Sequence, residues 1–115
     1  MSPEEQRALE DFVAAVRAYY GANLRDVLMY GSRARGDDGP NSDVDLAVIL
    51  KDGEWRRTPE LLRMADMSYD ALIQVGLSIH AMPIRESAWT TPESQPNKSF
   101  LLAVRRDGRP IRIAA

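Results

Sequence analysis

The sequence has no cysteine and a single histidine among its 115 residues. Without cysteine the chain can form no disulfide, thiolate nucleophile, zinc finger or iron–sulfur centre, and one histidine cannot build a histidine-rich metal site. Long apolar runs are also missing. The longest clearly apolar one is Leu46–Leu50, far short of the roughly 20 residues that span a bilayer. These absences exclude thiol chemistry and argue against a membrane protein.

The charge balance gives no excess of basic residues. Lysine and arginine number 15, aspartate and glutamate 17, for a net charge of −2. This balance disfavours a polybasic nucleic-acid binder. The first residues carry Glu4, Glu5, Glu10 and Asp11, whereas a signal peptide begins with basic residues. We therefore expect a cytoplasmic protein.

The length suits one domain. A chain of 115 residues that is 44% hydrophobic can bury a normal core without disulfides or metal ions. A second domain of ordinary size does not fit. We therefore expect residues 1–115 to form a single domain.

An amphipathic helix is predicted at the N-terminus. Ser2 can cap it, Pro3 suits its first position, and Glu5 completes a capping box. Gly21 ends it. Its apolar residues recur at spacings of three and four and form one face: Leu9, Phe12, Val13, Val16 and Tyr20.

The rest of the chain alternates strands and helices in a way that predicts an α+β fold of order α-β-β-α-β-α. Strands are predicted over 24–30, 43–50 and 77–84, helices over 58–75 and 98–107, a loop or helical turn over 31–42, a brief helical turn at 87–89 and a last strand or tail at 111–113. The second of the longer helices, opened by Thr58, Pro59 and Glu60, carries an apolar stripe that we assign to the core: Leu61, Leu62, Ala65, Tyr69, Leu72 and Ile73.

Two carboxylates stand at the start of the second strand. Asp43 and Asp45 point to the same face because side chains alternate along a strand. Two carboxylates roughly 6 Å apart repel by ~2–3 kcal/mol at an effective dielectric constant near 20. A divalent cation relieves the repulsion, and Mg²⁺ binds carboxylate and phosphate oxygens together. The alternative is a pair of solvated acids at a loop edge.

A Gly-Ser pair ends the first strand. Gly31 permits close approach of the backbone, and exposed N–H groups with the Ser32 hydroxyl can cradle an anion. Arg33 and Arg35 could neutralise a triphosphate, or else pair with Asp37 or Asp38. Gly-Ser after one strand and Asp-x-Asp on the next would place phosphate donors opposite metal carboxylates.

The chain carries Gly31-Ser32, then ten residues, then Asp43-Val44-Asp45. This pattern resembles the signature of the DNA polymerase β-like nucleotidyltransferase superfamily. The small size resembles its minimal nucleotidyltransferases (MNT), including the antitoxins of MNT–HEPN toxin–antitoxin pairs. The resemblance implies a mixed sheet of three to four strands with flanking helices. It also implies Mg²⁺-dependent transfer of a nucleoside monophosphate from a nucleoside triphosphate to a hydroxyl.

The resemblance assigns roles to individual residues. Asp43 and Asp45 would be the catalytic metal ligands, and Gly31 and Ser32 would bind the nucleotide phosphates with Arg33 as a further contact. In MNT–HEPN pairs the resemblance implies that ATP supplies AMP to a tyrosine of the HEPN-type toxin.

One part of the pattern is missing. Catalytic members of the superfamily place a third carboxylate on a later strand, and the strand predicted over 77–84 has none. His80 and Glu86 are the tentative third-site candidates, His80 also being explicable as a hydrogen-bonded strand histidine. A solvated helix face accounts better for Asp66 and Asp70 than a metal role.

Three functions therefore stay open. The first is an enzyme that adenylylates a protein partner. The second is a non-catalytic module that neutralises a partner by forming a complex. The third is a nucleotidyltransferase acting on a small molecule, for which the chain would need a homo-oligomer to build an acceptor pocket. A nucleic-acid polymerase is disfavoured by the charge balance.

Overall fold

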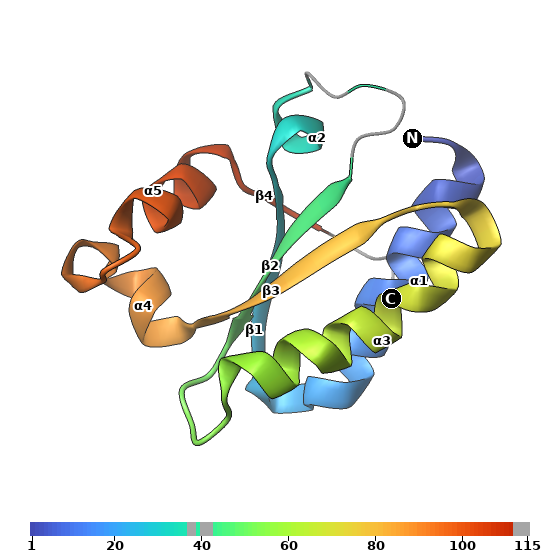
Figure 1. Cartoon of the computed structure of the whole chain (residues 1–115). Coiled ribbons are helices and arrows are strands. Elements are labelled where there is room, and N and C mark those ends of the chain that lie inside the picture. Colours follow the sequence, from blue (N-terminus) through green and yellow to red (C-terminus); the bar gives the residue numbers. More distant parts are fainter. Residues whose placement is uncertain (37–38, 40–42, 112–115) are drawn as a thin grey trace.

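A four-stranded mixed sheet organises the chain. The computed structural model describes residues 1–36, 39 and 43–111, and in these ranges the strand order is β3-β2-β1-β4 (Figure 1). β2 runs antiparallel to β1 and parallel to β3, and β4 pairs antiparallel with β1. This confirms the α+β class. The strands are β1 (Leu24–Tyr30), β2 (Val44–Leu50), β3 (Ile79–Arg85) and β4 (Arg109–Pro110).

Helices cover both faces of the sheet. α1 and α3 pack on one face, and the elements that follow β3 pack on the other (Figure 1). Two short 3-10 helices occupy Gly21–Asn23 and Pro92–Ser94. The helices are α1 (Pro3–Tyr20), α2 (Ser32–Arg35), α3 (Arg57–Val75), α4 (Glu86–Thr90) and α5 (Lys98–Asp107).

The start of α1 follows the capping box. The Glu5 backbone N–H donates to Ser2 Oγ at 3.1 Å, and the Ser2 backbone N–H donates to Glu5 Oε1 at 2.9 Å. These bonds satisfy backbone donors that a helix start leaves without partners. The helix ends at Tyr20, just before Gly21.

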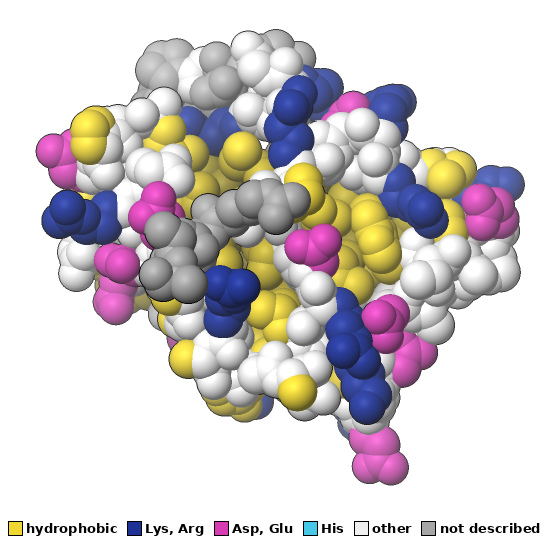
Figure 2. All heavy atoms as spheres, turned by 180° about the vertical axis from the view of Figure 1, so that it is seen from behind, with side chains coloured by type: hydrophobic (Ala, Val, Ile, Leu, Met, Phe, Trp, Pro, Cys, Tyr) yellow, Lys and Arg dark blue, Asp and Glu magenta, His cyan; other side chains and the backbone are white. Residues whose placement is uncertain are grey.

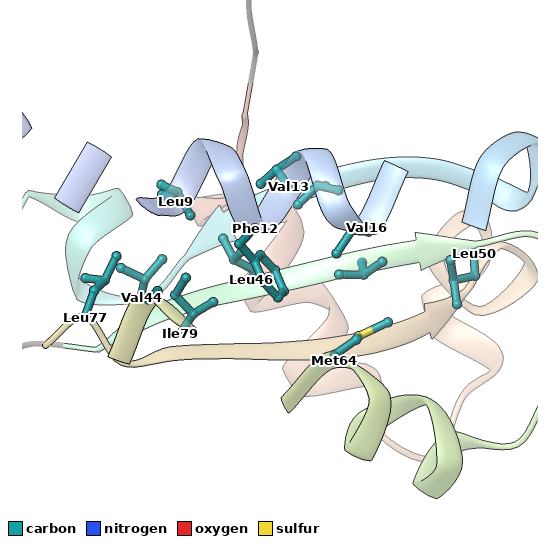
Figure 3. Close-up of a cluster of buried hydrophobic side chains, with 13 residues drawn as sticks. Leu9, Phe12, Val13, Val16, Val44, Leu46, Leu50, Met64, Leu77 and Ile79 are labelled. Carbon is teal, nitrogen blue, oxygen red and sulfur yellow. The ribbon is translucent and has the colours of Figure 1, made fainter. Parts of the chain in front are cut away.

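β2 is the centre of the core. Its residues alternate between the two faces of the sheet, and only Asp45 among them is not fully buried. Val44, Leu46, Val48 and Leu50 belong to the cluster on the α1 and α3 side. Figure 3 shows Val44, Leu46 and Leu50 among side chains of those helices. The opposite face holds a second cluster: Leu28, Ala47, Ile49, Ile84, Leu101 and Val104.

The predicted core stripe of α3 is wrong. Leu62, Tyr69 and Ile73 are more than half exposed, whereas the buried residues of the helix are Glu60, Met64, Ser68 and Ala71. Both sets recur at helical spacing, so periodicity alone does not choose between them. Burial of a glutamate is tolerated because the Tyr20 hydroxyl donates to Glu60 Oε1 at 2.8 Å.

Several predicted boundaries shift by one or two residues. α3 begins at Arg57, so Pro59 is its third residue and not its first. β2 begins at Val44, which leaves Asp43 just before the strand, and β3 spans Ile79–Arg85 instead of 77–84. The helical turn after β3 and the last helix are confirmed. The predicted pairing partners Asp37 and Asp38, and Ile113 of the last predicted strand, lie outside the described residues.

The surface has mixed charge on the face shown in Figure 2. There, lysine and arginine side chains are interspersed with aspartate and glutamate, and hydrophobic side chains lie between them. Within the described ranges, none of the helices is both long and apolar enough to cross a membrane.

Shortening a side chain of the central strand should destabilise the protein more than shortening a side chain on the exposed face of α3. We expect Leu46→Ala, at a site with no exposed surface, to lower the free energy of unfolding by ~2–5 kcal/mol. Leu62→Ala should change it by less than ~0.5 kcal/mol. Urea denaturation followed by circular dichroism measures both. Equal losses would place Leu62 in the core after all.

Candidate functional site

Gly31 faces the Asp45 carboxylate. Tyr30 pairs with Asp45 across the β1–β2 ladder, and Gly31 follows directly at the turn into α2. A Cβ at Gly31 would lie 2.6 Å from Asp45 Oδ2, and the backbone φ of Gly31 is +79°. Glycine is therefore required twice at this position, for its φ and for the space that the carboxylate occupies.

Asp45 is the one charged side chain on the central strand. It is half-buried and lies between Tyr30 on β1 and His80 on β3, its partners in register. Burial raises the pKa of its carboxyl above the usual range. The nearby His80 lowers that pKa, and the negative charge of Asp43 raises it. A carboxylate in this position is stabilised by an added positive charge.

Asp43 and His80 lie at the same end of the sheet. Asp43 Oδ2 is 3.5 Å from His80 Nε2, and the same nitrogen is 3.2 Å from Ser78 Oγ. Because β2 and β3 are parallel, the start of β3 lies beside the start of β2. The structure thus brings His80 to the aspartate pair, where the missing carboxylate was expected.

Glu86 lies elsewhere. It follows the far end of β3, six residues beyond His80 or roughly 20 Å along the strand direction. Its carboxylate pairs with Arg25, with Oε2 3.3 Å from Nε. Of the two tentative third-site candidates, the structure brings only His80 to the aspartates.

Three arginines attach α2 to the rest of the molecule. Arg33 has a side chain only 8% exposed, with Nη2 4.0 Å from Glu5 Oε2 on α1. Arg35 Nη1 is 3.6 Å from Asp107 Oδ2, and Arg109 Nε donates to the Ala34 carbonyl at 2.7 Å. These contacts hold α2, which begins at Ser32 directly after Gly31. Contact of Arg33 with phosphate stays a prediction.

A pocket of about 570 Å³ opens beside Asp45 and His80. Sequence reasoning missed it because it assigned its α3 wall to the core. The sequence did contain a signal for the pocket, because α3 carries more apolar residues than one buried face can accommodate. The pocket is lined by Tyr30, Asp45, Arg57, Leu61, Ala65, Ser68, Tyr69, Leu72, Ser78, Ile79, His80, Ala81 and Met82.

The aspartate pair suits a cation that shares its coordination with a substrate. No group of three or more histidine or acidic side chains in the described residues is arranged to hold a metal ion. Mg²⁺ commonly takes one or two carboxylates and completes its shell with water and phosphate oxygens. The raised pKa of Asp45 agrees with a site built for a positive charge. The donor set therefore fits Mg²⁺ bound together with a phosphate compound.

Known proteins resemble this chain in both sequence and fold. The family described as "Nucleotidyltransferase domain" matches residues 9–103. Protein MJ0604 of Methanocaldococcus jannaschii, designated a candidate protein adenylyltransferase, is 28% identical over 105 residues, 91% of this chain and 95% of that protein.

Two solved structures share the fold at low identity. One is a toxin–antitoxin crystallised with AMP-PNP, with a TM-score of 0.59 and 17% identity over 88% of this chain and 70% of that one. The other is a candidate nucleotidyltransferase from Sulfolobus solfataricus, with a TM-score of 0.59 and 18% identity over 93% of this chain and 81% of that one.

Substitution at Gly31 should disturb Asp45, whereas the same change at Gly36 should not. Both glycines have positive φ, but an added Cβ at Gly36 meets no atom within 4 Å. We expect each alanine variant to lose ~1–2 kcal/mol of stability from backbone strain. Only Gly31→Ala should also shift the Asp45 carboxyl carbon resonance in NMR spectra. An unchanged resonance would contradict the close approach.

Proposed function

Because this chain belongs to the nucleotidyltransferase domain family, we propose that it transfers AMP from ATP to a hydroxyl group of another protein, with Mg²⁺ bound at Asp43 and Asp45. The finer proposal for the acceptor is a toxin of the HEPN type. The relative designated a protein adenylyltransferase and the toxin–antitoxin structure with AMP-PNP support a nucleotide substrate and a protein acceptor.

The contact between Gly31 and Asp45 carries the proposal. It places a turn without a side chain against a half-buried carboxylate whose pKa is raised. A phosphate group can approach the backbone at Gly31 while a cation at Asp45 neutralises it.

The protein residues bind and orient the reactants. Gly31 and Ser32 would hold the phosphates that leave as pyrophosphate, on the β1 and α2 side of Asp45. When bound, Mg²⁺ supplies the positive charge that stabilises the attacking and leaving oxygens of an in-line displacement. The acceptor hydroxyl then approaches from the side opposite to the leaving group, which is the side of β3.

His80 lies on that side. Its Nε2, 3.5 Å from Asp43 Oδ2, could donate a hydrogen bond to the oxygen of the incoming hydroxyl and orient that oxygen toward the α-phosphorus. This role replaces the carboxylate that other catalytic members of the superfamily have on the corresponding strand.

Label transfer tests the proposed activity. The pure protein is incubated with Mg²⁺ and ATP labelled at the α-phosphate, together with a lysate of its host. We expect a labelled protein band, reduced by roughly 10²–10³-fold in Asp43→Asn/Asp45→Asn because metal-ion stabilisation contributes several kcal/mol. The exposed pair Glu54→Gln/Glu93→Gln, which lies away from the aspartates and from α3, is the control for loss of negative charge in general. A band unaffected by the change at Asp43 and Asp45 would refute the mechanism.

A non-catalytic binding module is the second candidate function. It is favoured by the start of β3, where His80 on the strand and Ser78 just before it lie at the pair and no carboxylate of β3 does. In that function the fold binds nucleotide or partner without transferring a group.

Nucleotide binding separates the two candidates. With Mg²⁺ and AMP-PNP at 100 times its dissociation constant, bound ligand should stabilise the wild-type protein by ~2.7 kcal/mol, measured as a higher Tm. Asp45→Asn should lose most of this shift. A shift without any label transfer supports the binding module, and the absence of both excludes a nucleotide role.

A further inference from the structure

α3 presents a second apolar face to the solvent. We call it the outer α3 stripe, and it consists of Leu62, Ala65, Tyr69, Leu72 and Ile73. Leu62 and Ile73 are each 63% exposed, Tyr69 59% and Leu72 46%. These four account for most of the large exposed apolar side chains of the described residues. A cluster of this kind marks an interaction surface, because scattered exposed apolar residues are the ordinary case.

The spacing of the stripe fits another helix. Leu62, Ala65, Tyr69 and Leu72 follow one another at three, four and three residues. This is the repeat with which two helices pack side by side along an apolar seam. The stripe runs over about three turns of α3, long enough for a helix and too long for a single side chain.

The stripe is continuous with the pocket at the aspartate pair. Ala65, Tyr69 and Leu72 belong to the stripe and also line the pocket that contains Asp45 and His80. A partner lying on the stripe therefore borders the side of the site from which the acceptor hydroxyl approaches. The nucleotide phosphates, proposed at Gly31 and Ser32, stay clear of it.

The other border of the stripe is acidic. Asp66 is four residues after Leu62, and Asp70 is three before Ile73, so both follow the stripe on the side away from the pocket. Both are exposed, and neither forms an ion pair within the described part of the chain. Two exposed carboxylates one turn apart attract lysine or arginine from a partner.

We propose that the outer α3 stripe binds an amphipathic helix of the acceptor protein, with an apolar seam at heptad spacing and lysine or arginine along the edge that faces Asp66 and Asp70. The identification of this partner as the acceptor rests on the proposed function. The binding of a basic amphipathic helix does not.

A second copy of the chain fits the stripe less well. Two α3 helices packed antiparallel through Leu62 and Ile73 would bring the acidic edges of both copies, Asp66 and Asp70, close to each other. Like charges at this distance oppose association. The charge of the stripe thus favours a basic partner over self-association.

Designed peptides test the surface directly. Two labelled helical peptides, roughly three heptads long, share one leucine seam and differ only in lysine or glutamate flanks. By fluorescence anisotropy we expect the full chain to bind the lysine peptide about tenfold more tightly than the glutamate peptide. Equal affinity for both, or no binding, overturns the proposal. A concentration-dependent dimer in light scattering that blocks the peptide would assign the stripe to a second copy and overturn it too.

Variants locate the binding. Leu62→Ser/Ile73→Ser should weaken the affinity for the lysine peptide by tenfold or more, since each side chain would be buried on binding. Asp66→Asn/Asp70→Asn should remove most of the preference for lysine flanks. Leu102→Ser, at an exposed leucine on α5 that is 42% accessible, is the matched control and should bind as wild type. If the control variant lost as much affinity as the stripe variants, binding would not be located at the outer α3 stripe.

The label-transfer assay links the surface to the acceptor. Leu62→Ser/Ile73→Ser should lower labelling of the acceptor band at low lysate concentration while leaving the AMP-PNP shift in Tm unchanged. If wild type transfers no label but binds the lysine peptide, the proposed activity fails and the surface stands. If the stripe variants label the acceptor like wild type, the activity stands and its link to this surface fails.

Discussion

The close approach of Gly31 to Asp45 is the contact on which the site depends. β1 and β2 are antiparallel, so the end of one meets the start of the other, and the ladder sets Tyr30 opposite Asp45. The Asp45 carboxylate then occupies the space that a side chain at position 31 would need. The proposed phosphate site and the proposed cation site thus share one boundary. A shift of this ladder by one residue would turn Asp45 into the core and separate them.

The sheet places a charged group where burial disfavours it. β2 is buried along its length except at Asp45, and burial raises the pKa of that carboxyl. In the free protein His80 partly offsets this effect of burial on the Asp45 pKa. The parallel pairing of β2 and β3 places His80 in register with Asp45. The proposed cation shared with a nucleotide would remove the rest, and ligand binding would then be coupled to stability through this one side chain.

α3 serves two surfaces at once. Its inner face joins the core through Met64 and Ala71, and Glu60 is accommodated there by the Tyr20 hydroxyl. Its outer face joins the pocket to an apolar surface bordered by acidic residues. The helix therefore connects the core that holds β3 in place with the surface from which an acceptor would reach Asp45 and His80.

Local sequence was enough to predict the helices and strands, the capping box of α1 and the Gly-Ser and Asp-x-Asp pattern, because each depends on residues near one another in the chain. Which face of α3 is buried follows from tertiary packing, since the buried row and the exposed apolar row both have helical spacing and packing against α1 and β3 selects one. The tertiary structure also separated the two third-site candidates: parallel pairing carries His80 to Asp43, while Glu86 follows the opposite end of the strand. Strand direction and register are long-range properties, and no local pattern encodes them.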